Sequence, residues 1–254
     1  MGVLVVTGTG TGVGKTVVTA AIAATAAARG LSVAVVKPAQ TGVVGDQPGD
    51  LAEVARLTGI ADLHEFARYP DPLSPAAAAR RSGLPPLELV GTARSIDTLA
   101  GTRRLVLVEG AGGLLVRYDP DGRTVADLAR ALGAPLVVVT EPSLGTLNAT
   151  ALTLEAMAHR GLELAGLVLG SWPASPDLAA RSNVSDLEML AARPLSGAIP
   201  AGAGQLDPAT FQTVARAGLA PAFGGIFDPG VFRERGAIPA STMSTPASTS
   251  GGSQ

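Results

Sequence analysis

The chain has 254 residues with no cysteine, two histidines, 16% charged side chains and a formal net charge of -2. The lack of cysteine excludes disulfides, thiolate metal sites and cysteine nucleophiles, and the shortage of cations argues against a nucleic-acid partner. No segment approaches the ~20 apolar residues of a membrane span, and the N-terminus lacks the basic region of a signal peptide, so we expect a cytoplasmic protein without a membrane partner.

Apolar runs rich in Val and Leu alternate with helical patterns along the chain. We predict strands at residues 3–7, 32–36, 105–109, 136–140, 164–169 and 196–199. Helices are predicted at residues 15–29, 49–57, 75–82, 87–99, 124–132, 147–159, 177–190 and 207–217. Because the strand runs lack polar alternation, they are typical of strands covered on both faces. The order predicts an α/β fold, doubly wound, with a mostly parallel sheet and helices on both faces.

The first predicted strand runs into the segment GTGTGVGKT (residues 8–16) and then into a helix, which is the context of a phosphate-binding P-loop. The backbone N–H groups of residues 12–14 are expected to wrap phosphates at the helix N-terminus, where the helix dipole favours anions. Lys15 would reach the β- and γ-phosphates, and Thr16 would place its hydroxyl on Mg²⁺. Conventional spacing has glycine where this chain has Thr9, so the sequence predicts a P-loop NTPase fold with a stretched loop.

The second predicted strand ends in VVKPAQTG, which places Lys37 near the carboxyl edge of the sheet. Lys15 and Lys37 are the only lysines of the sequence, and the other 17 of its 19 Lys and Arg residues are arginines. A compact ammonium that a planar guanidinium cannot replace is therefore expected at both positions. Beside a P-loop, Lys37 is a candidate to contact the transferring phosphoryl group, with Pro38 fixing a turn and Thr41 offering a hydroxyl. A surface lysine is the alternative.

Two acidic residues follow these motifs. Asp50, in GDLAEV, stands near a predicted helix start, where capping the helix is the alternative to a metal-binding role. Glu109 ends the apolar run LVLVE as a Walker B acid would, and the glycines of EGAGG let the backbone approach a ligand closely. Thr16, Asp50 and Glu109 together offer the oxygen ligands and waters that Mg²⁺ prefers.

The segments GTGTGVGKT, KPAQTG, GDLAEV, VEGAGGLLV and LGTLN, in this order and spacing, resemble dethiobiotin synthetase over residues 1 to about 225. The resemblance implies an ATP-dependent cyclo-ligase of biotin biosynthesis. Such an enzyme closes the ureido ring from 7,8-diaminopelargonate and CO₂ or bicarbonate, through a carbamate and a carbamic–phosphoric anhydride. It implies Mg²⁺ as cofactor and ATP or another nucleoside triphosphate as co-substrate. It also implies a homodimer with the substrate near the subunit interface.

The resemblance assigns roles to particular residues, with Lys15 and Lys37 as the catalytic ones. The metal would be held by Thr16, Asp50 and Glu109. The nucleotide would be bound by Gly12, Val13, Gly14, Lys15, Thr16, Val17, Asp50, Glu109, Gly110, Ala111, Gly112, Gly170, Ser171, Pro200, Ala201 and Gly202. The substrate would be bound by Thr11, Thr41, Gly145, Thr146, Leu147 and Asn148. An ordinary loop-to-helix cap is the alternative for the last four.

The sequence departs from the family pattern in two places. Ala76 follows Ser74 and Pro75 where the family often has histidine. Gly170 and Ser171 stand after the fifth parallel strand, where an asparagine typically reads adenine. The base preference of the site is therefore left open.

Other P-loop classes fit the sequence less well. A switch ATPase of the partition or division-site type is the main alternative, but its signature lysine would fall at Gly10. A glutamine amidotransferase relative needs a cysteine nucleophile, and a GTPase needs an Asn-Lys-x-Asp motif for which neither lysine is available. We assign residues 1–228 to one domain and predict a disordered tail for the Ser-, Thr-, Pro- and Gly-rich residues 229–254, with a functional tail as the alternative.

Overall fold

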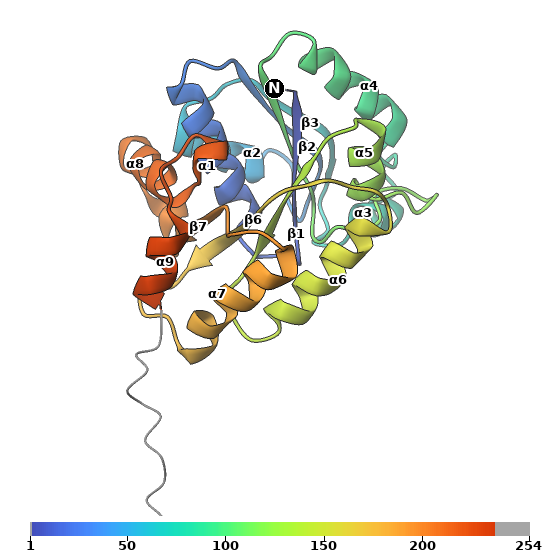
Figure 1. Ribbon diagram of the computed structural model, residues 1–254. Helices are drawn as coiled ribbons and strands as arrows, with labels where there is room; N and C mark the ends of the chain where they lie inside the picture. Colours follow the sequence, from blue (N-terminus) through green and yellow to red (C-terminus); the bar gives the residue numbers. More distant parts are fainter. Residues whose placement is uncertain (1, 237–254) are drawn as a thin grey trace, which may run out of the picture.

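Seven parallel strands form one sheet at the centre of the structure, a computed structural model that describes residues 2–236 (Figure 1). The strands are β1 (Val3–Gly8), β2 (Val33–Thr41), β3 (Leu63–Tyr69), β4 (Leu105–Glu109), β5 (Leu136–Thr140), β6 (Leu164–Trp172) and β7 (Gly197–Pro200). Their order across the sheet is β3-β2-β4-β1-β5-β6-β7. The central strand β1 therefore delivers the P-loop to the carboxyl edge of the sheet, where ligands of doubly wound folds bind.

Helices cover both faces of the sheet (Figure 1). One face is covered by α1 (Lys15–Ala28), α2 (Asp50–Thr58) and α8 (Pro208–Gly218). The other face is covered by α3 (Pro75–Ser82), α4 (Leu89–Ala100), α5 (Val125–Ala131), α6 (Thr146–Ala158) and α7 (Leu178–Ala191). Two short 3₁₀ helices, η1 (Ala203–Gln205) and η2 (Pro221–Phe223), and the final helix α9 (Pro229–Gly236) follow β7 in the chain. The predicted doubly wound α/β fold is confirmed.

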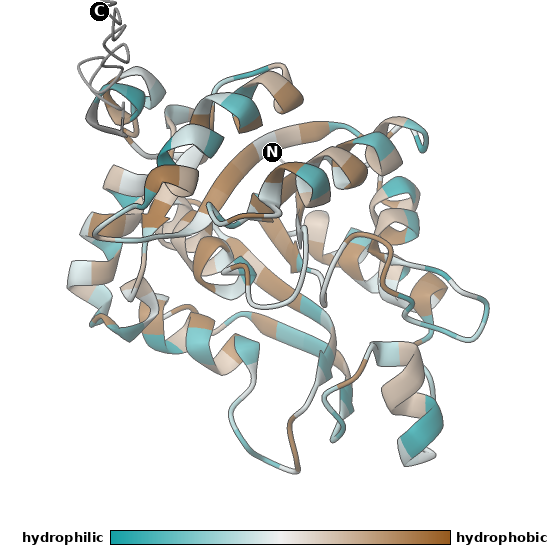
Figure 2. Ribbon diagram, turned by 90° about the horizontal axis from the view of Figure 1, so that it is seen from below, coloured by the Kyte–Doolittle hydropathy of each residue, from teal (hydrophilic) through white to brown (hydrophobic). Residues whose placement is uncertain are grey.

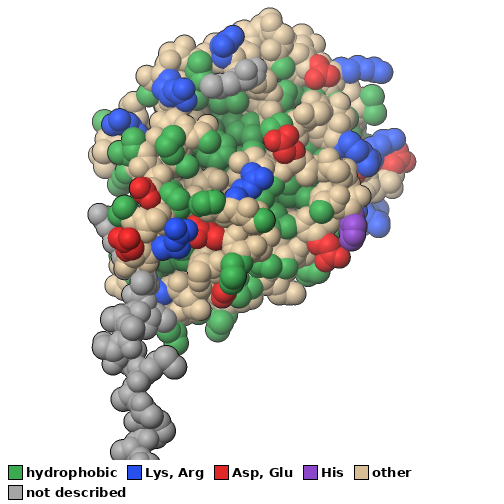
Figure 3. Space-filling view, viewed as in Figure 1, with side chains coloured by type: hydrophobic (Ala, Val, Ile, Leu, Met, Phe, Trp, Pro, Cys, Tyr) green, Lys and Arg blue, Asp and Glu red, His purple; other side chains and the backbone are tan. Residues whose placement is uncertain are grey.

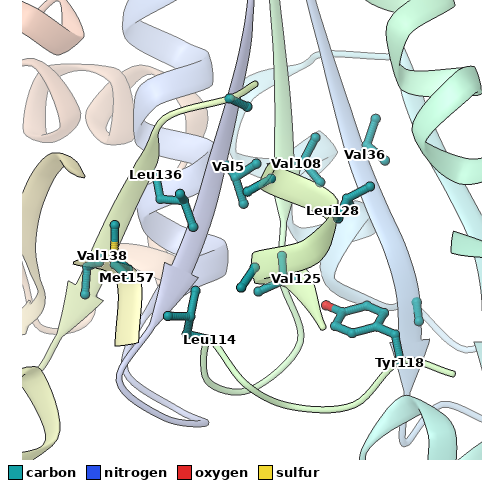
Figure 4. Close-up of a cluster of buried hydrophobic side chains, with 14 of the residues drawn as sticks. Val5, Val36, Val108, Leu114, Tyr118, Val125, Leu128, Leu136, Val138 and Met157 are labelled. Atoms are coloured by element: carbon teal, nitrogen blue, oxygen red, sulfur yellow. The ribbon is translucent and has the colours of Figure 1, made fainter. Parts of the chain in front are cut away.

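The sheet separates two apolar cores. Alternate residues of a strand point to opposite faces, so Val5 packs in one core while its neighbour Val6 packs in the other. Figure 4 shows Val5 and other valines of the strands pointing towards Val125 and Leu128 of α5. The hydropathy colouring of Figure 2 places the apolar residues along the central strands and the hydrophilic ones on the outer helix faces. Burial on both faces explains why the strand sequences show no polar alternation.

The sequence pattern does not predict strand β3. Its residues LHEFARY include polar and charged side chains, so no apolar run marks it. It lies at the edge of the sheet and, among the described residues, pairs only with β2. An edge strand needs less apolar surface than a central one, which is why a run-based search overlooks it.

Strand β2 extends beyond its predicted end and contains Pro38 within it, so the predicted turn at that proline is wrong. Pairing with β4 stops at Val36, whereas pairing with β3 continues to Thr41. Pro38 is tolerated because no strand of the sheet faces β2 on the β4 side from there on. The sheet thus opens between β2 and β4, and Lys37 lies where the opening begins.

The predicted tail is wrong for residues 229–236, which form α9. Its Phe232 ring lies 4.8 Å from the Trp172 ring and 5.2 Å from the Phe227 ring, measured between centroids. Arg233 pairs with Glu188 of α7 at 2.5 Å. The rest of the predicted tail, residues 237–254, lies outside the described residues.

The face of the molecule in Figure 3 carries acidic and basic side chains interspersed with apolar ones. Within residues 2–236, none of the helices has the length and apolar character that a bilayer crossing requires.

Candidate active site

The P-loop connects β1 to α1 and leaves a run of backbone donors free. Gly12 and Gly14 adopt left-handed backbone angles, with φ of 81° and 93°. Glycine favours such angles because it lacks a Cβ. Within residues 2–236, the backbone N–H groups of residues 10–17 have no hydrogen-bond acceptor. Free N–H groups at the start of α1, reinforced by the helix dipole, suit an anion such as a phosphate.

The side chain of Lys15 folds back over this loop. Its Nζ donates a hydrogen bond to the carbonyl oxygen of Gly10 at 2.7 Å, and only 7% of the residue is exposed. Burial, together with the nearby charge of Lys37, lowers the pKa of Lys15 to about 8. No carboxylate of the described residues forms a salt bridge with Lys15. The ammonium group of Lys15 is therefore available to pair with an anion that binds at the P-loop.

Lys37 lies on β2 between two carboxylates. Its Nζ is 2.5 Å from Oδ2 of Asp50 and 2.8 Å from Oε1 of Glu109, and it donates to the carbonyl of Gly110 at 3.3 Å. Burial disfavours the ammonium, but the two carboxylates outweigh burial and raise the pKa of Lys37 above its usual value. Because Lys37 is buried and paired, the surface-lysine alternative is wrong.

Glu109 has one carboxylate oxygen with partners and one without. Oε1 accepts hydrogen bonds from Thr16 Oγ1 and Lys37 Nζ, both at 2.8 Å. Oε2 is buried and has no partner in the part of the chain that the structure describes. Burial raises the pKa of Glu109, against the opposing charge of Lys37.

These oxygens fit a magnesium ion. A buried, unpartnered carboxylate oxygen needs an explanation, and a bound ion is one. Mg²⁺ takes one or two carboxylates and keeps several waters, which matches Glu109, Asp50 and the hydroxyl of Thr16. No group of three His, Cys, Asp or Glu side chains converges within residues 2–236, so the protein alone would not complete the coordination.

Asp50 is the first residue of α2, and the helix-cap alternative is wrong. The N-cap position belongs to Gly49. Burial favours the neutral carboxyl, but the pairing with Lys37 outweighs it and lowers the pKa of Asp50. The sequence pattern does not predict a role for Gln40, whose Oε1 accepts the backbone N–H of Asp50 at 2.9 Å. Gln40 thereby ties the start of α2 to β2, and its place in KPAQTG was the available signal.

Tyr118 holds the loop that follows β4. Its hydroxyl accepts the N–H of Ala111 at 2.5 Å, and the residue is fully buried. Figure 4 shows its ring among the apolar side chains of the core. Gly112 turns the loop with φ of 68°. The sequence does not predict this role of Tyr118, because a single tyrosine between charged residues forms no pattern.

One open cleft of about 750 Å³ joins these groups at the carboxyl edge of the sheet. The predicted residues that line it are Thr11, Gly12, Gly14, Lys15, Thr16, Val17, Lys37, Thr41, Asp50, Glu109, Ala111 and Gly112. Val13 is buried in the core instead, and Gly110 contributes its carbonyl to Lys37. Ser74 and Pro75 also line the cleft, so the segment that departs from the family at Ala76 reaches it.

The segments predicted to bind the base lie outside this cleft, at the ends of β6 and β7. Gly170 packs against the P-loop so closely that a Cβ atom there would lie 2.0 Å from the carbonyl oxygen of Val13. A side chain at position 170 is thus incompatible with the backbone as it stands. Ala201 donates its N–H to the carbonyl of Trp172 at 2.8 Å, which places Pro200, Ala201 and Gly202 beside the end of β6, next to the exposed Ser171.

The last predicted segment, Gly145 to Asn148, begins helix α6 and does not line the cleft of its own chain. Gly145 is the N-cap, with φ of 94°. The backbone N–H groups of Leu147 and Asn148 have no acceptor within the described part of the chain. A carboxylate could accept from both, and the dipole of α6 would favour its charge.

The chain is similar to several known proteins. A family model described as "AAA domain" matches residues 3–208. The chain is 64% identical over 238 residues to the ATP-dependent dethiobiotin synthetase BioD of Parafrankia sp. (strain EAN1pec), covering 94% of this chain and 100% of that protein. It is 66% identical to the protein of the same name from Frankia casuarinae, covering 92% and 99%. It is 57% identical to the one from Streptomyces coelicolor, covering 92% and 99%.

Solved structures share the fold at low identity. The septum site-determining protein MinD complexed with Mg-ADP, from Pyrococcus horikoshii OT3, superposes with a TM-score of 0.53 at 19% identity, covering 84% of this chain and 91% of that one. A ParA family ATPase from Chlorobium tepidum TLS gives a TM-score of 0.53 at 18% identity, covering 84% and 90%. These likenesses concern the fold alone.

Proposed function

The chain belongs to the dethiobiotin synthetase family, and from that premise we propose which of its residues carry the reaction. Its function is that of an ATP-dependent dethiobiotin synthetase, a ligase of biotin biosynthesis with ATP as co-substrate. One observation supports placing this reaction in the cleft. Lys15 and Lys37, the only two lysines of the sequence, both line it, together with Asp50 and Glu109.

The proposed reaction needs no nucleophile from the protein. One amine of 7,8-diaminopelargonate captures CO₂ and forms a carbamate. A carbamate oxygen attacks the γ-phosphorus of ATP, and the bond to the β-phosphate oxygen breaks to release ADP. The second amine then attacks the carbonyl carbon of the mixed anhydride, phosphate leaves, and the ureido ring closes. Negative charge builds or moves at each phosphoryl step, so fixed cations stabilise the transition states.

The two lysines would supply these cations from different sides. Lys15 exchanges its hydrogen bond with Gly10 for the β- and γ-phosphates, while the N–H groups of residues 10–17 hold the remaining phosphate oxygens. Lys37 lies at the opening between β2 and β4 and lines the same cleft as Thr11 and Thr41. The carbamate would therefore bind between the two ammonium groups.

Thr16, Glu109 and Asp50 would hold a magnesium ion. When bound, Mg²⁺ supplies positive charge to the phosphate oxygens. Glu109 offers its unpartnered Oε2, and Lys37 balances the charge of both carboxylates within the protein.

We further propose a homodimer in which residues 145–148 of one subunit bind the carboxylate of the substrate held by the other. Two observations support this arrangement. The N–H groups of Leu147 and Asn148 are unpaired within residues 2–236, and the segment does not reach the cleft of its own chain. The base of the nucleotide would lie by Gly170, Ser171 and residues 200–202, read by backbone groups.

A direct assay tests the proposal. Purified protein is supplied with 7,8-diaminopelargonate, bicarbonate, MgCl₂ and ATP, and dethiobiotin is measured by mass spectrometry alongside phosphate release. We expect one phosphate for each dethiobiotin and no turnover without the diamine. Hydrolysis stimulated by DNA or lipid vesicles, but not by the diamine with bicarbonate, would instead favour a switch ATPase.

A further inference from the structure

Four threonine hydroxyls connect the P-loop, β5 and α6 inside the fold. Thr140 is the last residue of β5 and is fully buried. Its Oγ1 lies 3.1 Å from that of Thr9, 2.8 Å from that of Thr146 and 3.1 Å from that of Thr150. Thr9 begins the P-loop, whereas Thr146 and Thr150 belong to the first turns of α6. One side chain thus contacts both segments.

The hydroxyl of Thr140 is fully used by these contacts. A threonine hydroxyl donates one hydrogen bond and accepts two, which equals the three neighbours. Thr150 is as buried as Thr140, and Thr146 is 3% exposed, so water does not replace a missing partner there. The preceding strand residues are Leu136 followed by three valines, and a fourth valine at position 140 would fill the same volume. The polar group is therefore present for its hydrogen bonds.

Both connected segments are also anchored by other contacts. The backbone N–H of Thr9 donates to the carbonyl of Val139 at 3.0 Å. Asn183 of α7, 6% exposed, donates to the carbonyl of Pro142 at 2.8 Å and to that of Ser143 at 3.3 Å. Asn183 thus holds the loop before α6, and Thr140 holds the first turns of α6.

We propose that Thr140 is a positioning residue that couples the P-loop to the N-terminus of α6. Through its three hydroxyl contacts it fixes the phosphate-binding N–H groups relative to those of Leu147 and Asn148. This inference rests on the proposed function, in which residues 145–148 bind the substrate carboxylate. Small displacements of binding groups slow catalysis strongly. Loss of the Thr140 hydroxyl should therefore affect the kinetics for both ATP and 7,8-diaminopelargonate.

The test compares Thr140→Val, which keeps the shape and removes the hydroxyl, with Thr140→Ser, which keeps the hydroxyl. The matched control is Thr153→Val. Thr153 is a buried threonine of α6 whose hydroxyl bonds, within residues 2–236, only to the carbonyl of Ala149. We expect Thr140→Val to raise the KM for 7,8-diaminopelargonate about tenfold and to lower kcat. Thr140→Ser should stay within about threefold of the native enzyme, and Thr153→Val should match it.

Crossed variants separate coupling from a general loss of stability. Thr9→Val, on the P-loop side, should raise the KM for the diamine, and Thr150→Val, on the α6 side, should raise the KM for ATP. These two variants also serve if Thr140→Val fails to fold. Unchanged kinetics in Thr140→Val, or losses in Thr153→Val equal to those in Thr140→Val, would overturn the inference. A native enzyme that forms no dethiobiotin would count against the proposed function, which is a different outcome.

Discussion

The Nζ atom of Lys37 lies 2.8 Å from Oε1 of Glu109, and both side chains are almost completely buried. The same oxygen accepts the hydroxyl of Thr16, and the same ammonium pairs with Asp50. A buried charge is tolerated only when it is paired, and removing one partner leaves the other uncompensated. Strands β2 and β4 and helices α1 and α2 are therefore joined through one charge cluster at the proposed phosphoryl-transfer site.

Lys37→Arg should reduce dethiobiotin formation by about 10²–10³-fold, the usual effect of losing one well-placed electrostatic donor. The guanidinium keeps the charge but cannot fit between Asp50 and Glu109 in the space of an ammonium. The measurement is kcat with saturating substrates, with circular dichroism to confirm folding. Near-native turnover would show that the compact ammonium is not required.

Glu109→Gln should lower turnover most strongly at limiting Mg²⁺, by at least about tenfold, because it removes an anionic oxygen ligand. Asp50→Asn should act in the same direction. The measurement is a MgCl₂ titration of the rate. Glu53→Gln is the matched control, because Glu53 lies on the same helix as Asp50 and pairs with Arg56 on the exposed side. A native Mg²⁺ requirement in Asp50→Asn would remove Asp50 from the metal site.

Nucleotide affinity of the free enzyme should fall as pH rises through about 8. Burial and Lys37 lower the pKa of Lys15 from 10.5 to about 8, and phosphate binds the protonated form. The measurement is the Kd for ADP between pH 7 and 9.5 by calorimetry. The pH-dependent fall should be absent in Lys15→Arg, whose side chain stays protonated throughout. A slope equal to that of the native protein in this variant would assign the effect to another group.

The contribution of Lys15 to folding stability should rise with pH in the range where nucleotide affinity falls. Between about pH 8 and 10.5 the unfolded chain holds a proton on Lys15 that the folded chain has lost. The Lys15 contribution to the free energy of unfolding therefore increases with pH across this window. Urea unfolding of the native protein and of Lys15→Met, compared at pH 7.5 and 9.5, isolates that contribution as the difference between the two.

Discrimination among nucleoside triphosphates should be weak. The position where the family typically carries an asparagine is Gly170, and the carbonyl of Val13 leaves no space for a side chain there. A site without a side chain dedicated to one base cannot reject the others strongly. When the dissociation constants of the four triphosphates are measured, at least one triphosphate other than ATP should have a value within about tenfold of that of ATP. A preference for ATP over all others by several orders of magnitude would contradict this reading of the base site.

Truncation after Asp228 should lower the melting temperature, whereas truncation after Gly236 removes none of the described contacts. The shorter chain loses Phe232, which packs on Trp172 and Phe227, at a cost of about 1–2 kcal/mol for a partly buried aromatic ring. Phe232→Ala in the full chain is the control and should reproduce most of the loss. Equal melting temperatures for the chain ending at Asp228 and the full chain would mean that α9 contributes little.

Local pattern in the sequence determined most of the fold. Strands covered on both faces must be apolar throughout, so the central strands could be found from their composition alone. Glycines at positive φ and a lysine between a strand and a helix are local requirements of phosphate binding, so the P-loop could be found as well. Edge strand β3 could not, because it buries less apolar surface. Helix α9 could not, because its packing depends on Trp172, which lies far from it in the chain.

Only the tertiary structure decided how the site is assembled. Asp50 begins a helix and Glu109 ends a strand, and nothing local indicates that both meet Lys37. The close packing of Gly170 against the carbonyl of Val13, and the hydroxyl cluster of Thr140, also join residues that are far apart in the chain. Such contacts depend on which strands are neighbours and where their pairing stops. A sequence pattern encodes the local backbone preference and burial of each residue, whereas the distance between two side chains is fixed only when the sheet has formed.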